Sequence, residues 1–140
     1  MADLSTQYLG LALNNPLVAS SSPLTGSVDS ALRLQEAGIA ALVMPSLFEE
    51  KILQEHALLD RFLDEQSLGH GEAQSFRPLP QGFRSTEEQY ADQLHALKQA
   101  LEIPVIASLN GITTGGWLEC AQQLVAAGAD ALELNAWHIP

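Results

Sequence analysis

The fold is decided by residues 127–135, which have the sequence AGADALELN. A similar stretch, AGIAALV, occurs at residues 37–43. In both stretches a helical pattern ends in Ala-Gly, and a short apolar run follows. A glycine directly after a helix can take the left-handed conformation that turns the chain back sharply. The apolar run is too short for a helix and is typical of a buried parallel strand. The repeat therefore predicts the helix-to-strand turn of a βα unit.

The same unit can be placed four times along the chain. Strands are expected at residues 17–21, 39–44, 104–109 and 131–135, and helices at residues 27–37 and 117–127. A small hairpin is expected at residues 8–13, before the first strand. Strands that alternate with helices predict a parallel sheet with right-handed crossovers.

The absence of a dinucleotide-binding motif narrows the choice of fold. The nearest glycine cluster, at residues 111–116, lacks the G-x-G-x-x-G spacing, which disfavours a dinucleotide site. A complete (β/α)8 barrel needs about 200 residues or more. The predicted fold class is therefore α/β: the N-terminal half of a (β/α)8 TIM barrel, with about four βα units and parallel strands, preceded by a small β-hairpin. We expect residues 1–140 to form one partial barrel domain, truncated after the fourth strand.

The connection between the second and third strands is the longest. Apolar residues recur at helical spacing over residues 47–63, and a polar stretch with glycine and proline follows over residues 66–84. A second helix is predicted to begin at Ser85, because Glu88 has capping-box spacing from it. A long loop at the carboxyl end of a strand is uncommon unless it is a lid, a binding loop or disordered. The sequence leaves these alternatives open.

The net charge disfavours anionic partners, and the cysteine content indicates the cellular compartment. Six basic residues against 17 acidic ones give a net charge of −11, which would repel nucleic acid and anionic membranes. The single cysteine, Cys120, excludes an intrachain disulfide framework and fits a reducing compartment. Because Cys120 falls in an apolar helical pattern, we expect a buried side chain and not a nucleophile. Neither a signal peptide nor a membrane span is recognisable, so a cytoplasmic location is predicted.

Small neutral polar residues gather at the carboxyl ends of the predicted strands. They are Ser20, Ser21, Ser22, Ser46, Asn110 and Asn135. In a barrel these strand ends build the active site. Hydroxyl and amide groups suit hydrogen bonding to a flat ring that is rich in heteroatoms. Turns also favour Ser and Asn, so each position alone has a simpler explanation. The strand ends taken together favour a functional role.

The same strand ends resemble a known family. Residues 15–24 (NPLVASSSPL), 45–50 (PSLFEE), 103–111 (IPVIASLNG) and 128–135 (GADALELN) are similar, in this order, to the dihydroorotate dehydrogenase family, and most closely to its dihydroorotate dehydrogenase-like branch. The resemblance implies an FMN-dependent (β/α)8 barrel that oxidises a CH–CH bond of dihydroorotate or a related dihydropyrimidine, in pyrimidine biosynthesis. It implies that Ser20, Ser21 and Ser22 lie against FMN. It also implies that Ser46, Asn110 and Asn135 lie near the isoalloxazine ring and the substrate.

Two positions depart from the family pattern. Classical members have a lysine just before the serine that matches Ser46, whereas this chain has Pro45, which has neither charge nor backbone donor. They also place a cysteine or serine base in the loop after the asparagine that matches Asn135. An ungapped alignment puts His138 at this position. His138 is therefore the candidate catalytic base, although a solvated histidine is the simpler interpretation. Both departures bear more on the choice of substrate than on flavin binding.

Parts of the family's flavin site have no counterpart in these residues. Members hold the flavin phosphate with loops after the seventh and eighth strands and use a fifth-strand lysine. We therefore expect the N-terminal part of an oxidoreductase, and we expect that the 140 residues alone neither hold FMN tightly nor turn over. An alternative is a non-catalytic half-barrel that pairs with itself, as a homo-oligomer, or with a complementary half. A third is a sugar-phosphate isomerase or synthase, for which only Glu133 supplies a suitable catalytic group.

Overall fold

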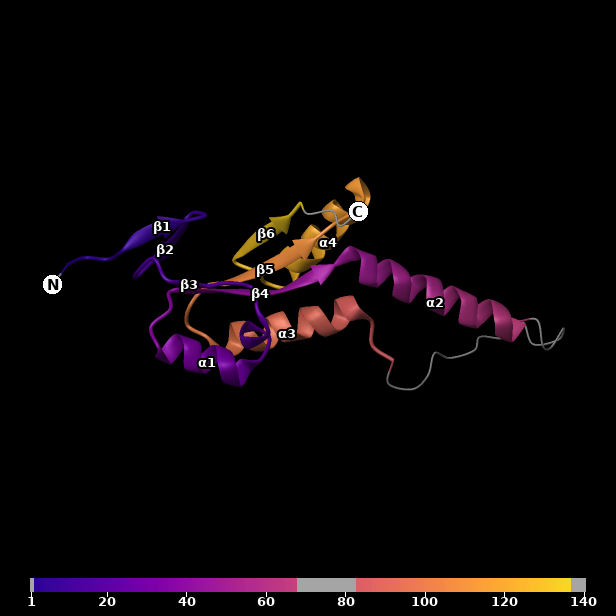
Figure 1. The fold of residues 1–140 in the computed structure, drawn as a ribbon, viewed down its shortest axis with the longest axis horizontal. Coiled ribbons are helices and arrows are strands. Elements are labelled where there is room, and N and C mark those ends of the chain that lie inside the picture. The colour runs from indigo at the N-terminus through magenta and orange to yellow at the C-terminus, as the bar shows by residue number, and fades with distance from the viewer. Residues whose placement is uncertain (1, 68–82, 137–140) are drawn as a thin grey trace.

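The computed structural model describes residues 2–67 and 83–136, except for the side chains of residues 63–67 and 114. Its elements, in chain order, are β1 Thr6–Tyr8, β2 Leu11–Leu13, β3 Val18–Ala19, the 3-10 helix η1 Pro23–Thr25, α1 Val28–Glu36, β4 Ala41–Phe48, α2 Glu49–Ser67, α3 Thr86–Ala100, β5 Val105–Asn110, α4 Thr114–Ala126 and β6 Ala131–Asn135. After the first hairpin, strands alternate with helices, and both helices predicted between the second and third strands of the sheet are present (Figure 1).

Four parallel strands form one sheet in the order β3-β4-β5-β6, which is also their order along the chain. Such an order arises when each right-handed crossover advances by one strand. β1 and β2 form a separate antiparallel hairpin, which lies beyond the amino-terminal end of the sheet (Figure 1). The predicted α/β class, the parallel sheet and the N-terminal hairpin are confirmed.

The helices pack against one face of the sheet. One buried cluster joins α1 and α3 to β4 and β5 through Ala31, Leu42, Met44, Leu94, Leu97, Leu101 and Val105. A second joins the starts of α2 and α4 to the same strands through Leu47, Ile52, Ala107, Leu109, Cys120 and Leu124. The opposite face carries a smaller cluster of Leu13, Ala40, Ala41, Val43 and Ile106. Side chains alternate between the two faces of a strand. The next side chains on this second face after Val43 and Ile106 therefore lie closer to the carboxyl ends of β4 and β5.

Both Ala-Gly turns have the predicted geometry. Gly38 and Gly128 have φ angles of +98° and +100°, in the region that favours glycine. The starts of α1 and α3 also agree with the sequence, whereas α4 begins at Thr114, three residues before its predicted start. The hydroxyl of Ser27 accepts the Ser30 N–H at the start of α1, and Ser85 and Glu88 form the expected capping box at the start of α3.

β4 differs most from its predicted bounds. The sequence suggests a strand that stops near residue 44, but β4 continues to Phe48. Val43 pairs with Ile106 and Ser46 pairs with Ser108, so β4 uses one residue more than β5 over this interval, which is a β-bulge. The bulge accommodates Pro45, which has no N–H for the ladder. The predicted strand at residues 17–21 is conversely reduced to Val18–Ala19.

α2 projects away from the sheet (Figure 1), and two carboxylates tie its first turns to the neighbouring helices. Glu49, only 4% exposed, accepts the N–H groups of Ile112 at 2.5 Å and Thr113 at 2.9 Å, and also the Thr113 hydroxyl, at the start of α4. Glu55 accepts the N–H of Thr86 at 3.0 Å and its hydroxyl at 2.5 Å, at the start of α3. Carboxylates at these ends satisfy orphan N–H groups and oppose the helix dipole.

The long polar connection predicted over residues 66–84 falls mostly outside the described residues. Within the described ranges, no helix has the length and apolar character that a membrane span needs.

Candidate functional site

Side chains from three neighbouring strands meet at the carboxyl end of the sheet. Ser46 of β4 and Ser108 of β5 have their hydroxyl oxygens 2.8 Å apart. The amide nitrogen of Asn135, from β6, lies 3.2 Å from the Ser46 Oγ and 3.0 Å from the Ser108 Oγ. Glu133 accepts a hydrogen bond from the Ser108 hydroxyl at 2.8 Å and from the Asn135 amide at 3.2 Å. We call these four residues the strand-end cluster.

The hydrogen bonds of the cluster fix which groups face a ligand. The single hydroxyl proton of Ser108 goes to Glu133, so the Ser46 hydroxyl must donate to Ser108. Three oxygen acceptors surround the Asn135 NH2, which settles the orientation of that amide. Within the described residues, the Asn135 carbonyl oxygen and the second oxygen of Glu133 then remain as acceptors. The cluster therefore suits a ligand that presents N–H or O–H donors.

Strand register explains why these residues meet. Ser108 pairs with both Ser46 and Glu133, and Asn110 pairs with Asn135. Ser46 lies three residues after Val43, and the bulge between them places the Ser46 side chain on the same face of the sheet as that of Ser108. In a regular strand the side chain of Pro45 would lie on that face instead.

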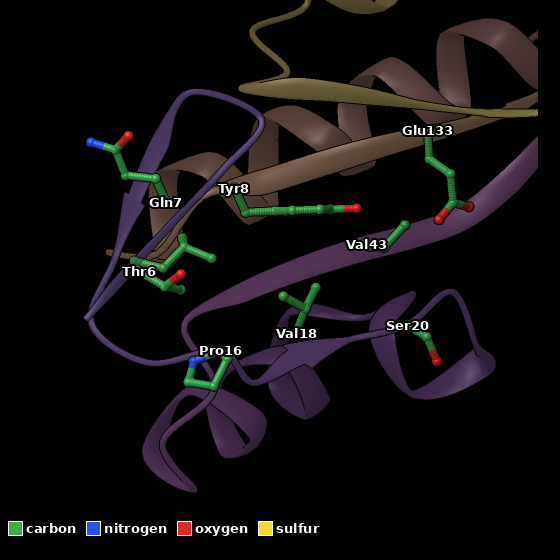
Figure 2. Close-up of a pocket in the computed structure, with 9 residues that line it drawn as sticks. Thr6, Gln7, Tyr8, Pro16, Val18, Ser20, Val43 and Glu133 are labelled. Atoms are coloured by element: carbon green, nitrogen blue, oxygen red, sulfur yellow. The ribbon is translucent and has the colours of Figure 1, made fainter. Parts of the chain in front are cut away.

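A pocket of about 370 Å³ lies on the same face of the sheet, between the hairpin and the cluster. Its wall includes Tyr8, Val18, Ser20, Val43 and Glu133, the last of which also belongs to the strand-end cluster. Figure 2 shows the Tyr8 ring extending from the hairpin toward Val43 and Glu133. The volume is in the range of small-molecule sites, about 300 to 1,000 Å³. An aromatic and aliphatic wall with one carboxylate suits a flat ring that carries hydrogen-bond donors.

The sequence-predicted site residues fall into three groups. Ser46 and Asn135 are brought together directly in the strand-end cluster, and Asn110 is beside Asn135 by register. Ser20 lines the pocket, whereas Ser21 and Ser22 lead into η1, where the Ser22 N–H donates to the Thr25 hydroxyl at 3.2 Å. His138 lies outside the described residues, and its proposed role as a base remains a prediction.

Ser108 was not among the site residues predicted from the sequence, and Glu133 was named only as the catalytic group of the sugar-phosphate alternative. The signal for both is period-two spacing: Ser108 precedes Asn110 by two residues, and Glu133 precedes Asn135 by two. In each strand the pair therefore shares a face. Ser108 is fully buried, so it organises the cluster, whereas Glu133 also lines the pocket.

Two other candidate chemistries are disfavoured. Cys120 is 4% exposed, and burial, reinforced by the charges of Glu87, Glu49 and Glu119, raises the pKa of its thiol. A thiolate nucleophile is therefore not expected there, in agreement with the sequence prediction. In the described part of the chain, no three His, Cys, Asp or Glu side chains are arranged to hold a metal ion.

Comparison of the sequence with protein-family models gives no match, and a search of curated proteins gives none either.

Proposed function

We propose that this chain forms the N-terminal half of an FMN-dependent (β/α)8 barrel oxidoreductase of the dihydroorotate dehydrogenase-like type. The observation that supports it is the strand-end cluster, which sits at the carboxyl edge of a sequentially ordered parallel sheet. Doubly wound sheets place helices on both faces, whereas here the helix clusters cover one face. A barrel needs this one-sided arrangement because its other face becomes the interior.

The chemistry of the cluster fits the ring of FMN. The isoalloxazine ring carries an N–H donor and carbonyl acceptors on a flat edge, and the Asn135 carbonyl oxygen can accept that N–H. Ser46 and Asn110 would lie along the same edge, and the Ser20–Ser22 segment would lie against the ring from β3. FMN, when bound, would supply the redox chemistry. The chain's own residues would orient the ring and bind the donors of a dihydropyrimidine substrate.

The starts of α3 and α4 are unfavourable places for the phosphate of FMN. Helix N-termini commonly bind phosphate, but the carboxylate of Glu49 occupies the start of α4 and that of Glu55 the start of α3. A phosphate would meet like charge at both ends. This supports a flavin site whose phosphate is held elsewhere. It also argues against the sugar-phosphate isomerase or synthase that the sequence leaves open.

Pro45 bears on the substrate. It lies in the bulge between Val43 and Ser46 and offers no charge to a substrate carboxylate, unlike the lysine of classical members. We propose that the substrate is a dihydropyrimidine whose recognition rests on ring N–H groups, with oxidation of its CH–CH bond. Dihydroorotate itself is the less favoured member of this class.

Flavin titration followed by NMR tests the proposal on the chain itself. Addition of FMN should shift the resonances of Ser46, Asn110 and Asn135, with a dissociation constant on the order of 1 mM because only the ring is held. Riboflavin, which lacks the phosphate, should bind within about twofold of FMN, since no cationic phosphate site contributes. Absence of shifts at these residues up to the solubility limit would refute the proposal. Tight, phosphate-dependent binding of FMN would contradict a site that holds only the flavin ring.

Asn135→Ala provides the matched variant for that titration. It removes three hydrogen bonds of the cluster and the acceptor for the ring N–H. The flavin affinity should fall by about fivefold or more, equivalent to roughly 1 kcal/mol. Asn14→Ala, an exposed change outside the site, serves as control and should leave the affinity unchanged. Equal affinities of the two variants would remove Asn135 from the flavin site.

The second candidate is a half-barrel that pairs with another copy or with a complementary half. It is favoured by apolar side chains on the last units of the sheet, because Leu118 and Val125 of α4 and Leu134 of β6 are each more than half exposed. β6 is also the edge strand of the described sheet. Sedimentation equilibrium separates this candidate from a monomeric flavin site, and a monomer throughout the concentration range would exclude self-pairing.

A further inference from the structure

Tyr90 of α3 reaches the strand-end cluster from the opposite, helix-covered side of the sheet. Its ring packs with both helix-side clusters. Its hydroxyl accepts the Ser108 N–H at 3.1 Å and donates to the Ser108 carbonyl oxygen at 3.3 Å. One phenol thus satisfies both backbone polar groups of the residue at the centre of the cluster.

The bulge in β4 explains why a side chain performs this role. Ser108 pairs with Ser46 directly after the bulge, where an extra residue locally disrupts the ladder between two strands. A buried backbone N–H or C=O without a partner costs about 1–3 kcal/mol. Ser108 is fully buried, so water does not reach its backbone N–H and C=O, which need partners from the protein. The Tyr90 hydroxyl is such a partner for both groups.

The backbone of Ser108 in turn fixes the ligand-facing groups. Its hydroxyl bonds to Ser46 at 2.8 Å, to Glu133 at 2.8 Å and to the Asn135 amide at 3.0 Å. A small shift of Ser108 would therefore move three side chains from three strands together. Side chains that hold other groups in place commonly decide the precision of a site.

We propose that Tyr90 is a positioning residue for the strand-end cluster: its phenol fixes the Ser108 backbone and so orients Asn135 and Ser46 toward the ligand. The identity of that ligand rests on the proposed flavin function, but the positioning role does not. The phenol must keep its proton in order to donate to the Ser108 carbonyl. Burial, together with the charge of Glu133 and against the Ser108 backbone hydrogen bond, raises the pKa of Tyr90 to about 12.

The test compares Tyr90→Phe with Tyr8→Phe, a change of the same kind at the other of the two tyrosines. In Tyr90→Phe without flavin, the Ser108 amide and the Asn135 side-chain amide should shift, and hydrogen exchange at Ser108 should accelerate about tenfold or more. With flavin present, the affinity should fall by about threefold to tenfold. Tyr8→Phe changes the pocket wall but none of the Ser108 backbone contacts, so it should leave hydrogen exchange at Ser108 unchanged.

A core variant on the same helix separates positioning from general destabilisation. Leu97→Val trims a fully buried side chain of α3 that has no polar atom to offer Ser108. It should lower stability without moving the Asn135 amide. If Leu97→Val moves that amide as Tyr90→Phe does, or if Tyr90→Phe leaves it in place, the proposal is overturned. If Tyr90→Phe moves it but the wild-type chain binds no flavin, Tyr90 still positions the cluster and the flavin function fails.

A second measurement keeps the native side chain. In Tyr8→Phe, Tyr90 is the sole tyrosine, so the absorbance of tyrosinate reports it alone. Its ionisation would abolish the bond to the Ser108 carbonyl. The carbon resonances of the Ser108 carbonyl and the Asn135 side-chain amide should therefore change with the same midpoint as the absorbance. Independent midpoints would contradict the coupling.

Discussion

Gly116→Ala should destabilise the chain by about 2 kcal/mol, whereas Gly115→Ala, one residue earlier, should stabilise it by about 0.5–1 kcal/mol. Both glycines lie in the first turn of α4, where alanine is ordinarily the better residue. A Cβ at Gly115 meets nothing within 4 Å. A Cβ at Gly116 would overlap the Glu49 carboxylate. That carboxylate would have to leave its hydrogen bonds with Ile112 and Thr113.

Chemical denaturation of the two variants and of Glu49→Ala checks this expectation. Once Glu49 is removed, Gly116→Ala should cost nothing further, so the two changes should be strongly non-additive. If Gly115→Ala and Gly116→Ala change the free energy of unfolding in the same direction, Glu49 does not occupy the start of α4.

Acid provides an independent check on the same contact. Burial raises the pKa of Glu49, but the hydrogen bonds from the Thr113 side chain and from the Ile112 and Thr113 N–H groups outweigh it, so the net pKa lies below its ordinary value of 4.5. A lowered pKa gives stability that is present above the unfolded value and lost as pH falls through the folded value. The difference in stability between wild type and Gly116→Ala should therefore narrow below about pH 4.5.

At alkaline pH, ionisation of Tyr90 should produce the second large change in the free energy of unfolding. Its pKa rises from 10.0 to about 12 on folding, so the unfolded chain releases this proton first. The stability due to Tyr90 is complete below pH 10 and is lost between about pH 10 and pH 12, at up to about 1.4 kcal/mol per pH unit. Other groups also titrate in this range. The stability difference between wild type and Tyr90→Phe isolates the phenol and should shrink by about 2 kcal/mol.

Denaturation of both proteins at several pH values between 8 and 12 measures that difference, with Tyr8→Phe as the matched control. A wild-type advantage over Tyr90→Phe that stays constant through pH 12 would show that the Tyr90 hydroxyl is not held as a buried neutral phenol.

Most of the fold is predictable because local signals and the global arrangement agree. The Ala-Gly turns at Gly38 and Gly128 predict where helices return to strands, and the spacing of Ser85 and Glu88 predicts the start of α3. The error at β4 has a physical cause. Proline disfavours a strand interior, so the chemistry of Pro45 predicts an end, whereas a bulge lets the strand continue. A bulge depends on the partner strand, which local sequence does not show.

The candidate site is predictable only in part, for a similar reason. Ser46, Asn110 and Asn135 are recognisable as polar residues at strand ends. Ser108 and Glu133 are recoverable from alternation with these residues. Tyr90 follows an ordinary helical pattern, and nothing near it in the sequence indicates that its hydroxyl bonds to the backbone of Ser108. Contacts of this kind arise from tertiary packing and require the structure.

The bulge in β4 also predicts which residues should vary together among related sequences. Deleting Pro45 would leave a regular ladder in which Ser46 still faces Ser108, so the polar row would survive the loss of one residue. The same deletion would restore a regular register beside Ser108, and the Tyr90 hydroxyl would then compete with the ladder for the Ser108 N–H and carbonyl. The extra residue and the tyrosine should therefore be gained or lost together among relatives. A chain with the extra residue but without the tyrosine would lack the partner that the Ser108 N–H and carbonyl have here.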